Sequence, residues 1–149
     1  MKRLSILAAA FTLSLSSSAF AASVDDAAGC KMYSQFGSTM VDFMLPLTLQ
    51  DFVDMMSGKD TEALAGMSVE LISQMDKGDM KTMLALGNEA QIVGRAAGEV
   101  AMQILMSGQA SSSSEVKTIM RSQCKKIGFT QLIANQKKAN QASALNLGQ

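Results

Sequence analysis

The chain has 149 residues and a formal net charge of +0, with 13 lysines and arginines against 13 aspartates and glutamates, and it contains no histidine. The absence of histidine excludes a Ser-His or Cys-His nucleophile, an imidazole general base and an imidazole metal ligand. Basic residues are few and aromatic residues make up only 5% of the chain, which argues against binding of nucleic acid.

Residues 1–21 have the pattern of a secretory signal peptide. Two basic residues precede an apolar run from 4 to 15, and Ala19 and Ala21 provide a small-x-small cleavage site. The apolar run is too short to span a bilayer. We therefore predict cleavage after Ala21 in a bacterial exporter, no transmembrane span in the mature chain, and a periplasmic or secreted product.

Cys30 and Cys124 are the only cysteines. Export places them in an oxidising compartment, where an even number of cysteines indicates a disulfide. Closing the long loop between them would contribute about 4 to 5 kcal/mol in the chain-entropy model. A redox-active or metal-binding pair is disfavoured because the Cys-x-x-Cys spacing of such sites is absent.

Helical periodicity begins soon after the predicted cleavage site. The first predicted helix ends or kinks near Pro46, which cannot continue it. A second helix begins at Thr48, which caps it, and stops at Gly58, and a third begins at Asp60. The apolar stripes expected to be buried on the first two helices are Tyr33, Phe36, Met40, Phe43 and Leu47, then Leu49, Phe52, Val53 and Met56.

Gly78 is predicted to close the third helix and Asp79 to cap one long amphipathic helix over about 80–107. Its apolar face carries no charge, and its middle consists of small residues. Each glycine inside a helix costs about 0.8 to 1 kcal/mol relative to alanine, so we expect a second helix packed closely against this face. The predicted helix-packing groove consists of Gly87, Ala90, Gly94, Ala97 and Ala101.

The serine tract Ser111–Ser114 is predicted to be an exposed linker, with Ser112 capping a further helix that ends at Gly128. A last short helix follows, and residues 143–149 are expected to form a frayed tail. No segment alternates as a half-buried strand does. The predicted fold is therefore all-α: a single domain over residues 22–142, built as an irregular bundle of five or six helices around the helix at 80–107, with one disulfide.

The charges are unevenly distributed along the chain. Residues 22–89 carry 11 acidic and 4 basic side chains, whereas residues 115–149 carry 1 acidic and 6 basic ones. We expect the two ends to attract each other in the folded protein, and a solvated charge asymmetry is the commoner alternative to an acidic surface that awaits a cationic partner.

Two carboxylate pairs, Asp51 with Asp54 and Asp60 with Glu62, are the candidates for acid and base catalysis. Their place at helix starts or on polar faces already explains them. The absence of tryptophan leaves little to stack on a sugar ring, so a cell-wall hydrolase is the weakest alternative.

Methionine is the one compositional excess, with 13 residues. Thioethers bind Cu(I), so a copper or small-ligand carrier is the second hypothesis, although core packing explains most methionines. The methionine pairs one turn apart are Met40 with Met44, Met80 with Met83, and Met102 with Met106.

The leading hypothesis is a small exported protein that binds another exported or envelope protein, without catalysis and without a cofactor or metal. Toxin neutralisers, chaperones and secretion accessory factors are examples of this class. The candidate partner-binding residues, expected to form an exposed apolar patch, are Leu84, Ile92, Met102 and Met106.

Overall fold

The computed structural model describes residues 24–146. The predicted signal peptide and its cleavage site lie outside the described residues, as do residues 147–149. The described part contains helices and no strand, so the all-α prediction is confirmed. Its seven helices are α1 (Asp26–Met44), α2 (Leu49–Met56), α3 (Thr61–Ser73), α4 (Lys77–Leu86), α5 (Glu89–Met106), α6 (Ser113–Ile127) and α7 (Phe129–Asn146).

Side-chain caps fix most of the helix starts. Thr48 and Asp51 form a capping box at α2, since each side chain accepts a hydrogen bond from the other residue's backbone N–H. Asp60 and Ser112 cap α3 and α6, as the sequence predicts. The start of α4 differs from the prediction because Asp76, and not Asp79, is its N-cap.

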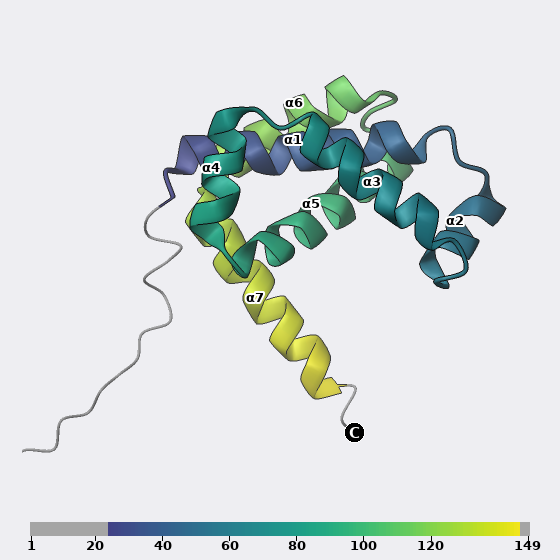
Figure 1. The fold of residues 1–149 in the computed structure, drawn as a ribbon. Coiled ribbons are helices and arrows are strands. Elements are labelled where there is room, and N and C mark those ends of the chain that lie inside the picture. Colours follow the sequence, from purple (N-terminus) through teal and green to yellow (C-terminus); the bar gives the residue numbers. More distant parts are fainter. Residues whose placement is uncertain (1–23, 147–149) are drawn as a thin grey trace, which may run out of the picture.

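The helix predicted over 80–107 is in fact two helices, α4 and α5. Gly87 ends α4 with φ 55° and ψ −123°. Residues other than glycine rarely adopt this backbone conformation. Asn88 then starts α5 in a new direction, as the bend between α4 and α5 shows (Figure 1). The prediction was wrong here because the apolar spacing of 3.6 continues through the break.

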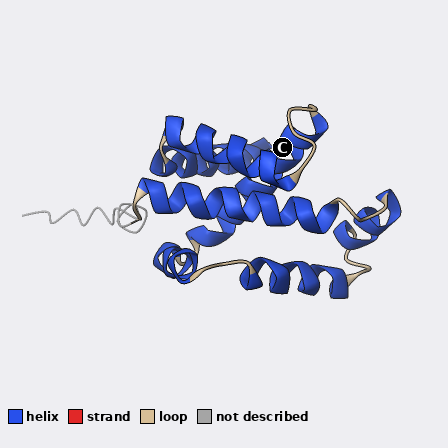
Figure 2. Ribbon diagram, turned by 90° about the horizontal axis from the view of Figure 1, so that it is seen from above, coloured by secondary structure: helices blue, strands red, loops and turns tan. Residues whose placement is uncertain are grey.

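The helix at the centre of the bundle is α1. It contacts α3, α4, α5, α6 and α7. Figure 2 shows this helix, which follows the grey N-terminal trace, with other helices on both of its sides. The expectation of a bundle arranged around residues 80–107 is therefore corrected: α1 supplies the surface on which the other helices pack.

Three glycines create notches that larger side chains fill. A β-carbon at Gly29 would lie 2.3 Å from the ring of Phe129, and one at Gly37 would lie 2.2 Å from the sulfur of Met120. On α5, a β-carbon at Gly98 would lie 2.7 Å from the Met40 methyl carbon. Close helix packing of the predicted kind therefore exists, but it centres on glycines outside the predicted groove.

The five residues of the predicted helix-packing groove fall in different environments. Ala97 and Ala101 are buried in the core, and Ala90 packs partly against it. Gly87 is exposed at the break between α4 and α5, because it is a helix cap and not a packing residue. Gly94 is half-buried, and a β-carbon there would meet only Phe36, at an ordinary contact distance of 3.9 Å.

The predicted disulfide between Cys30 and Cys124 is confirmed, and it joins α1 to α6. Both cysteines are fully buried in the core. Lys31 of α1 forms ion pairs with Asp76, the N-cap of α4, and with Asp79 of that helix, and these pairs attach α4 to α1. The hydrogen bond from Lys31 holds the pKa of the Asp76 carboxyl below its usual value.

The two ends of the fold differ from the prediction. At one end α7 continues to Asn146, so residues 143–146, expected to be frayed, are helical. At the other end Leu49 and Val53 of α2 are 81% and 48% exposed, although the sequence pattern predicts them to be buried. The reason is that α2 projects from the body with α3 as its main neighbour (Figure 1). The side chains of Phe52 and Met56 lie outside the described part.

Candidate functional site

Three of the four carboxylates singled out as catalytic candidates, Asp51, Asp54 and Asp60, take part in helix capping or local hydrogen bonds, and Glu62 lies in the first turn of α3. Asp51 accepts hydrogen bonds from the Thr48 hydroxyl and backbone, and these bonds lower the pKa of the Asp51 carboxyl. Asp54 accepts a hydrogen bond from Gln50. Within residues 24–146 no group of three or more histidine, cysteine, aspartate or glutamate side chains is placed to hold a metal ion.

The methionines of the predicted pairs have different environments. Met40 fills the notch at Gly98, and Met44 is half-buried at the end of α1. Met102 is half-buried on α5, whereas Met106 is 83% exposed at the end of that helix. Packing against glycine thus accounts for Met40, as it does for Met120, which the pairs did not include.

The predicted partner-binding residues do not lie on one helix. Leu84 is exposed on α4, whereas Ile92, Met102 and Met106 belong to α5 beyond the break at Gly87. Ile92 and Met102 are half-buried. The single apolar patch expected on one long helix therefore becomes separate positions on two helices.

A larger share of exposed apolar side chains lies elsewhere, on the α2–α3 arm, which we define as residues 45–73. Of the eight large hydrophobic side chains that are exposed in the described part of the chain, five belong to this arm. They are Leu45, Leu49, Val53, Val69 and Ile72. Exposed apolar surface of this kind marks interaction sites in many proteins.

The α2–α3 arm is also acidic. It carries five carboxylates and a single basic residue, Lys59. None of the five forms an ion pair with another described residue. The carboxylates are Asp51, Asp54, Asp60, Glu62 and Glu70.

An apolar groove of about 230 Å³ lies where the arm joins the body. Residues of α1, α3 and α5 line it, with Gly94 on α5 and Phe36 on α1 among them. Gly94 is thus part of an open groove and not of a closed seam between helices.

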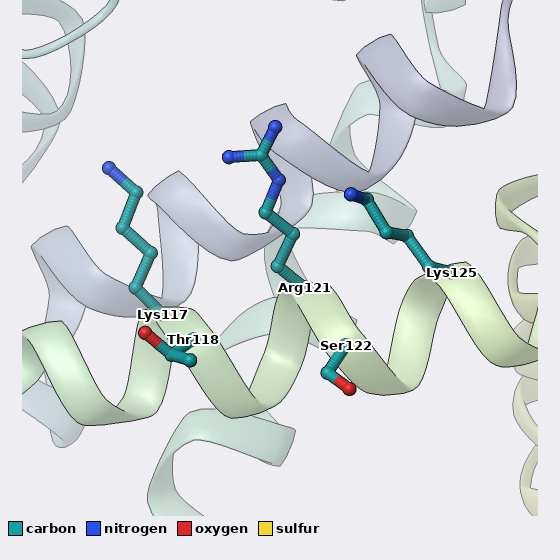
Figure 3. A pocket seen from close by; sticks show the side chains of 5 residues that line it. All are labelled: Lys117, Thr118, Arg121, Ser122 and Lys125. Atoms are coloured by element: carbon teal, nitrogen blue, oxygen red, sulfur yellow. The ribbon is translucent and has the colours of Figure 1, made fainter.

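The opposite charge gathers on α6. An open cleft of about 610 Å³ beside α1 is lined by three cationic and two hydroxyl side chains, which we call the α6 cationic cleft (Figure 3). They are Lys117, Arg121, Lys125, Thr118 and Ser122. Figure 3 shows the three cationic side chains extending from α6 on the same side.

The cations of this cleft lack anionic partners. Lys117 donates a hydrogen bond to the side-chain oxygen of Gln35 on α1, and none of the three cations forms an ion pair with a described residue. The attraction expected between the acidic and basic parts of the chain instead uses Lys137 of α7, which pairs with Glu89 of α5. Sequence reasoning missed the cleft, and the repeat of a cation at every fourth residue is the signal that could have found it.

Comparisons of the chain with protein-family models, with curated proteins and with solved structures return no match. None of the helices within residues 24–146 combines the length and the apolar character that crossing a bilayer requires.

Proposed function

We propose that this chain is an exported, non-enzymatic protein that binds another exported or envelope protein through the α2–α3 arm. The single observation that carries the proposal is the concentration of exposed aliphatic side chains there, with Leu49 81% exposed and Val69 67% exposed. Large aliphatic side chains on a partner would remove this surface from water, which favours association.

The rigidity of the body supports the proposal. The Cys30–Cys124 disulfide ties α1 to α6, and α3, the helix of the arm that packs on α1, is attached to this framework. A binding surface that is already ordered loses less conformational entropy when it meets a partner. The signal-peptide pattern of residues 1–21 supports the export part of the proposal.

Site-specific photocrosslinking in the producing cell tests the binding surface. A photoreactive residue at position 49 or 53 is expected to give one discrete adduct with another envelope protein. Replacing Leu45 and Leu49 with serine should remove the adduct formed from position 53, because these changes remove aliphatic surface next to the photoreactive residue.

The matched control places the photoreactive residue at Gln131, which is exposed on α7, away from the arm. The same adduct from Gln131, or an adduct from position 53 that survives both serine substitutions, would contradict the arm as the binding surface. Intact mass of the exported protein tests the export part, with cleavage after Ala21 and an oxidised cysteine pair as the expected result.

A further inference from the structure

We infer that the α6 cationic cleft is a second binding surface, which receives an acidic protein helix with a carboxylate at every fourth residue. This surface does not involve the α2–α3 arm, so the inference goes beyond the proposed function and can stand or fail without it. It rests on the spacing of Lys117, Arg121 and Lys125, on their lack of ion pairs with any described residue, and on their common direction from α6 (Figure 3).

The spacing of the cations defines the pattern of charges that the cleft would recognise. Lys117, Arg121 and Lys125 are each four residues apart on α6, and a helix rises about 1.5 Å per residue, so successive positions are separated by about 6 Å along the axis. Carboxylates at every fourth residue of a second helix have the same separation. A partner helix that lies along α6 would therefore place one carboxylate beside each cation.

The local chemistry favours ion pairs with such a helix. Arg121 provides a planar guanidinium that can hold one carboxylate through two hydrogen bonds. Lys117 is half-buried and is already held by Gln35, so its side chain has less freedom to lose on binding. Ser122 lines the same cleft and supplies a hydroxyl donor, whereas the Thr118 hydroxyl already donates a hydrogen bond to the backbone oxygen of Ser114.

A helix is favoured over a lipid bilayer because α6 has no free apolar face to insert. Val116, Met120 and Cys124 are fully buried against the body, and Ile127, at the end of the helix, is the one large apolar side chain that α6 exposes. Helices that bind a membrane surface insert an apolar face below the headgroups.

The test uses the full mature chain and a synthetic helical peptide with glutamate at three positions, each four residues from the next, in an alanine and glutamine background. Fluorescence anisotropy should detect binding that weakens as salt is added, because the ion pairs are solvent-accessible. Replacing Lys117, Arg121 and Lys125 together with glutamine should lower the affinity by about tenfold or more. Glutamine is nearly as good a helix former as lysine and arginine, so α6 should remain folded.

The matched control changes the same number of charges elsewhere, with glutamine in place of Lys59, Lys77 and Lys138. These three side chains are exposed and none of them lines the cleft. The control should keep the affinity within about twofold, because distant charges act only through the screened net charge of the protein. An equal loss in both triple variants would overturn the inference, since it would mean attraction to net charge alone.

Three further results would also overturn it. One is equal affinity for a peptide of the same composition whose glutamates lie on different faces of the helix. Another is binding to vesicles of equal parts phosphatidylglycerol and phosphatidylcholine, lost in the cleft variant, without binding to the peptide. The third is salt-sensitive self-association lost in the same variant, which would make a second copy of this chain the occupant. Photocrosslinking from the α2–α3 arm should be unchanged in the cleft variant, so failure of one surface is distinguishable from failure of the other.

Discussion

Three glycines of this fold, Gly29, Gly37 and Gly98, each leave space for one large side chain from another helix. The side chains that fill these notches differ in rigidity. At Gly98 the filling atoms are the flexible end of Met40, which is half-buried and can move. At Gly29 they belong to the ring of Phe129, which is fully buried. Methionine adapts to irregular gaps because its side chain is unbranched and has three rotatable bonds.

Gly29→Ala is therefore expected to destabilise the protein by about 1 to 3 kcal/mol, because the new methyl group and the Phe129 ring would occupy the same space. The matched change is Gly94→Ala, where the new methyl group meets only Phe36 at 3.9 Å. That variant should gain about 0.5 to 1 kcal/mol from the higher helix propensity of alanine. Urea denaturation of both variants measures the difference, and a Gly29→Ala variant as stable as the parent protein or more stable would contradict the notch at Gly29.

Tyr33 gives a prediction about pH. Its side chain is 2% exposed, and burial raises its pKa to about 12. An unfolded tyrosine ionises near pH 10, so the unfolded chain loses its proton before the folded chain does. The stability that comes from keeping Tyr33 neutral is present below about pH 10 and is lost as the pH rises toward 12, by up to about 2 to 3 kcal/mol.

The chain has one tyrosine and no tryptophan, so tyrosinate absorbance reports on Tyr33 alone. Titration of the folded protein should give a midpoint well above that of the urea-unfolded protein. Tyr33→Phe keeps the ring in the core and should remove this part of the alkaline loss of stability. A midpoint near 10 in the folded protein would show that the hydroxyl group is in contact with water.

At the level of the elements, the sequence predicts where helices start better than it predicts which helices pack against one another. Thr48, Asp60 and Ser112 were recognised as caps because capping uses hydrogen bonds within a few residues. Burial depends instead on what another element covers. The apolar spacing in α2 predicts a buried face, but no neighbour covers Leu49 or Val53. Periodicity alone could not distinguish these cases.

The break at Gly87 divides the predicted helix into two elements, α4 and α5, and the substitution Gly87→Ala tests this break. No atom lies within 4 Å of a β-carbon at this position, so any effect arises from the backbone. With φ 55° and ψ −123°, alanine is strained, and we expect a loss of about 1 to 3 kcal/mol.

Gly66→Ala is the control for the Gly87 substitution. Gly66 lies inside α3, and a β-carbon there meets only Phe43 at 3.9 Å, so this variant should gain rather than lose stability. Circular dichroism reports the helix content in both variants. More helix in Gly87→Ala without any loss of stability would mean that α4 and α5 can join into the continuous helix that the sequence pattern suggests.

At the level of the whole molecule, acidic and basic side chains occupy different parts of the fold. Carboxylates and exposed aliphatic side chains occur together on the α2–α3 arm, and unpaired cations line α6. The charge asymmetry is visible in the sequence, but the ion pairs are not. Only the folded arrangement brings Lys137 to Glu89 and leaves Arg121 without a carboxylate partner among residues 24–146. The candidate surfaces therefore emerged from tertiary structure.

The disulfide affects the whole molecule, because it joins α1 to α6. Most other helices contact α1, and α6 carries the cationic cleft. The two cysteines are 94 residues apart. Replacing both with alanine should lower the free energy of unfolding by about 4 to 5 kcal/mol, because the unfolded chain regains the freedom that the closed loop removed. This is comparable to the whole stability of a weakly stable domain.

Urea denaturation of the double variant measures the loss, with the oxidised parent protein as reference. The parent should also resist dithiothreitol under native conditions and become reducible as urea opens the fold, because both cysteines are 0% exposed. A double variant of unchanged stability would mean that residual structure restricts the unfolded chain even without the disulfide. In that case Met120 in the Gly37 notch, rather than the disulfide, would be the main link between the two helices.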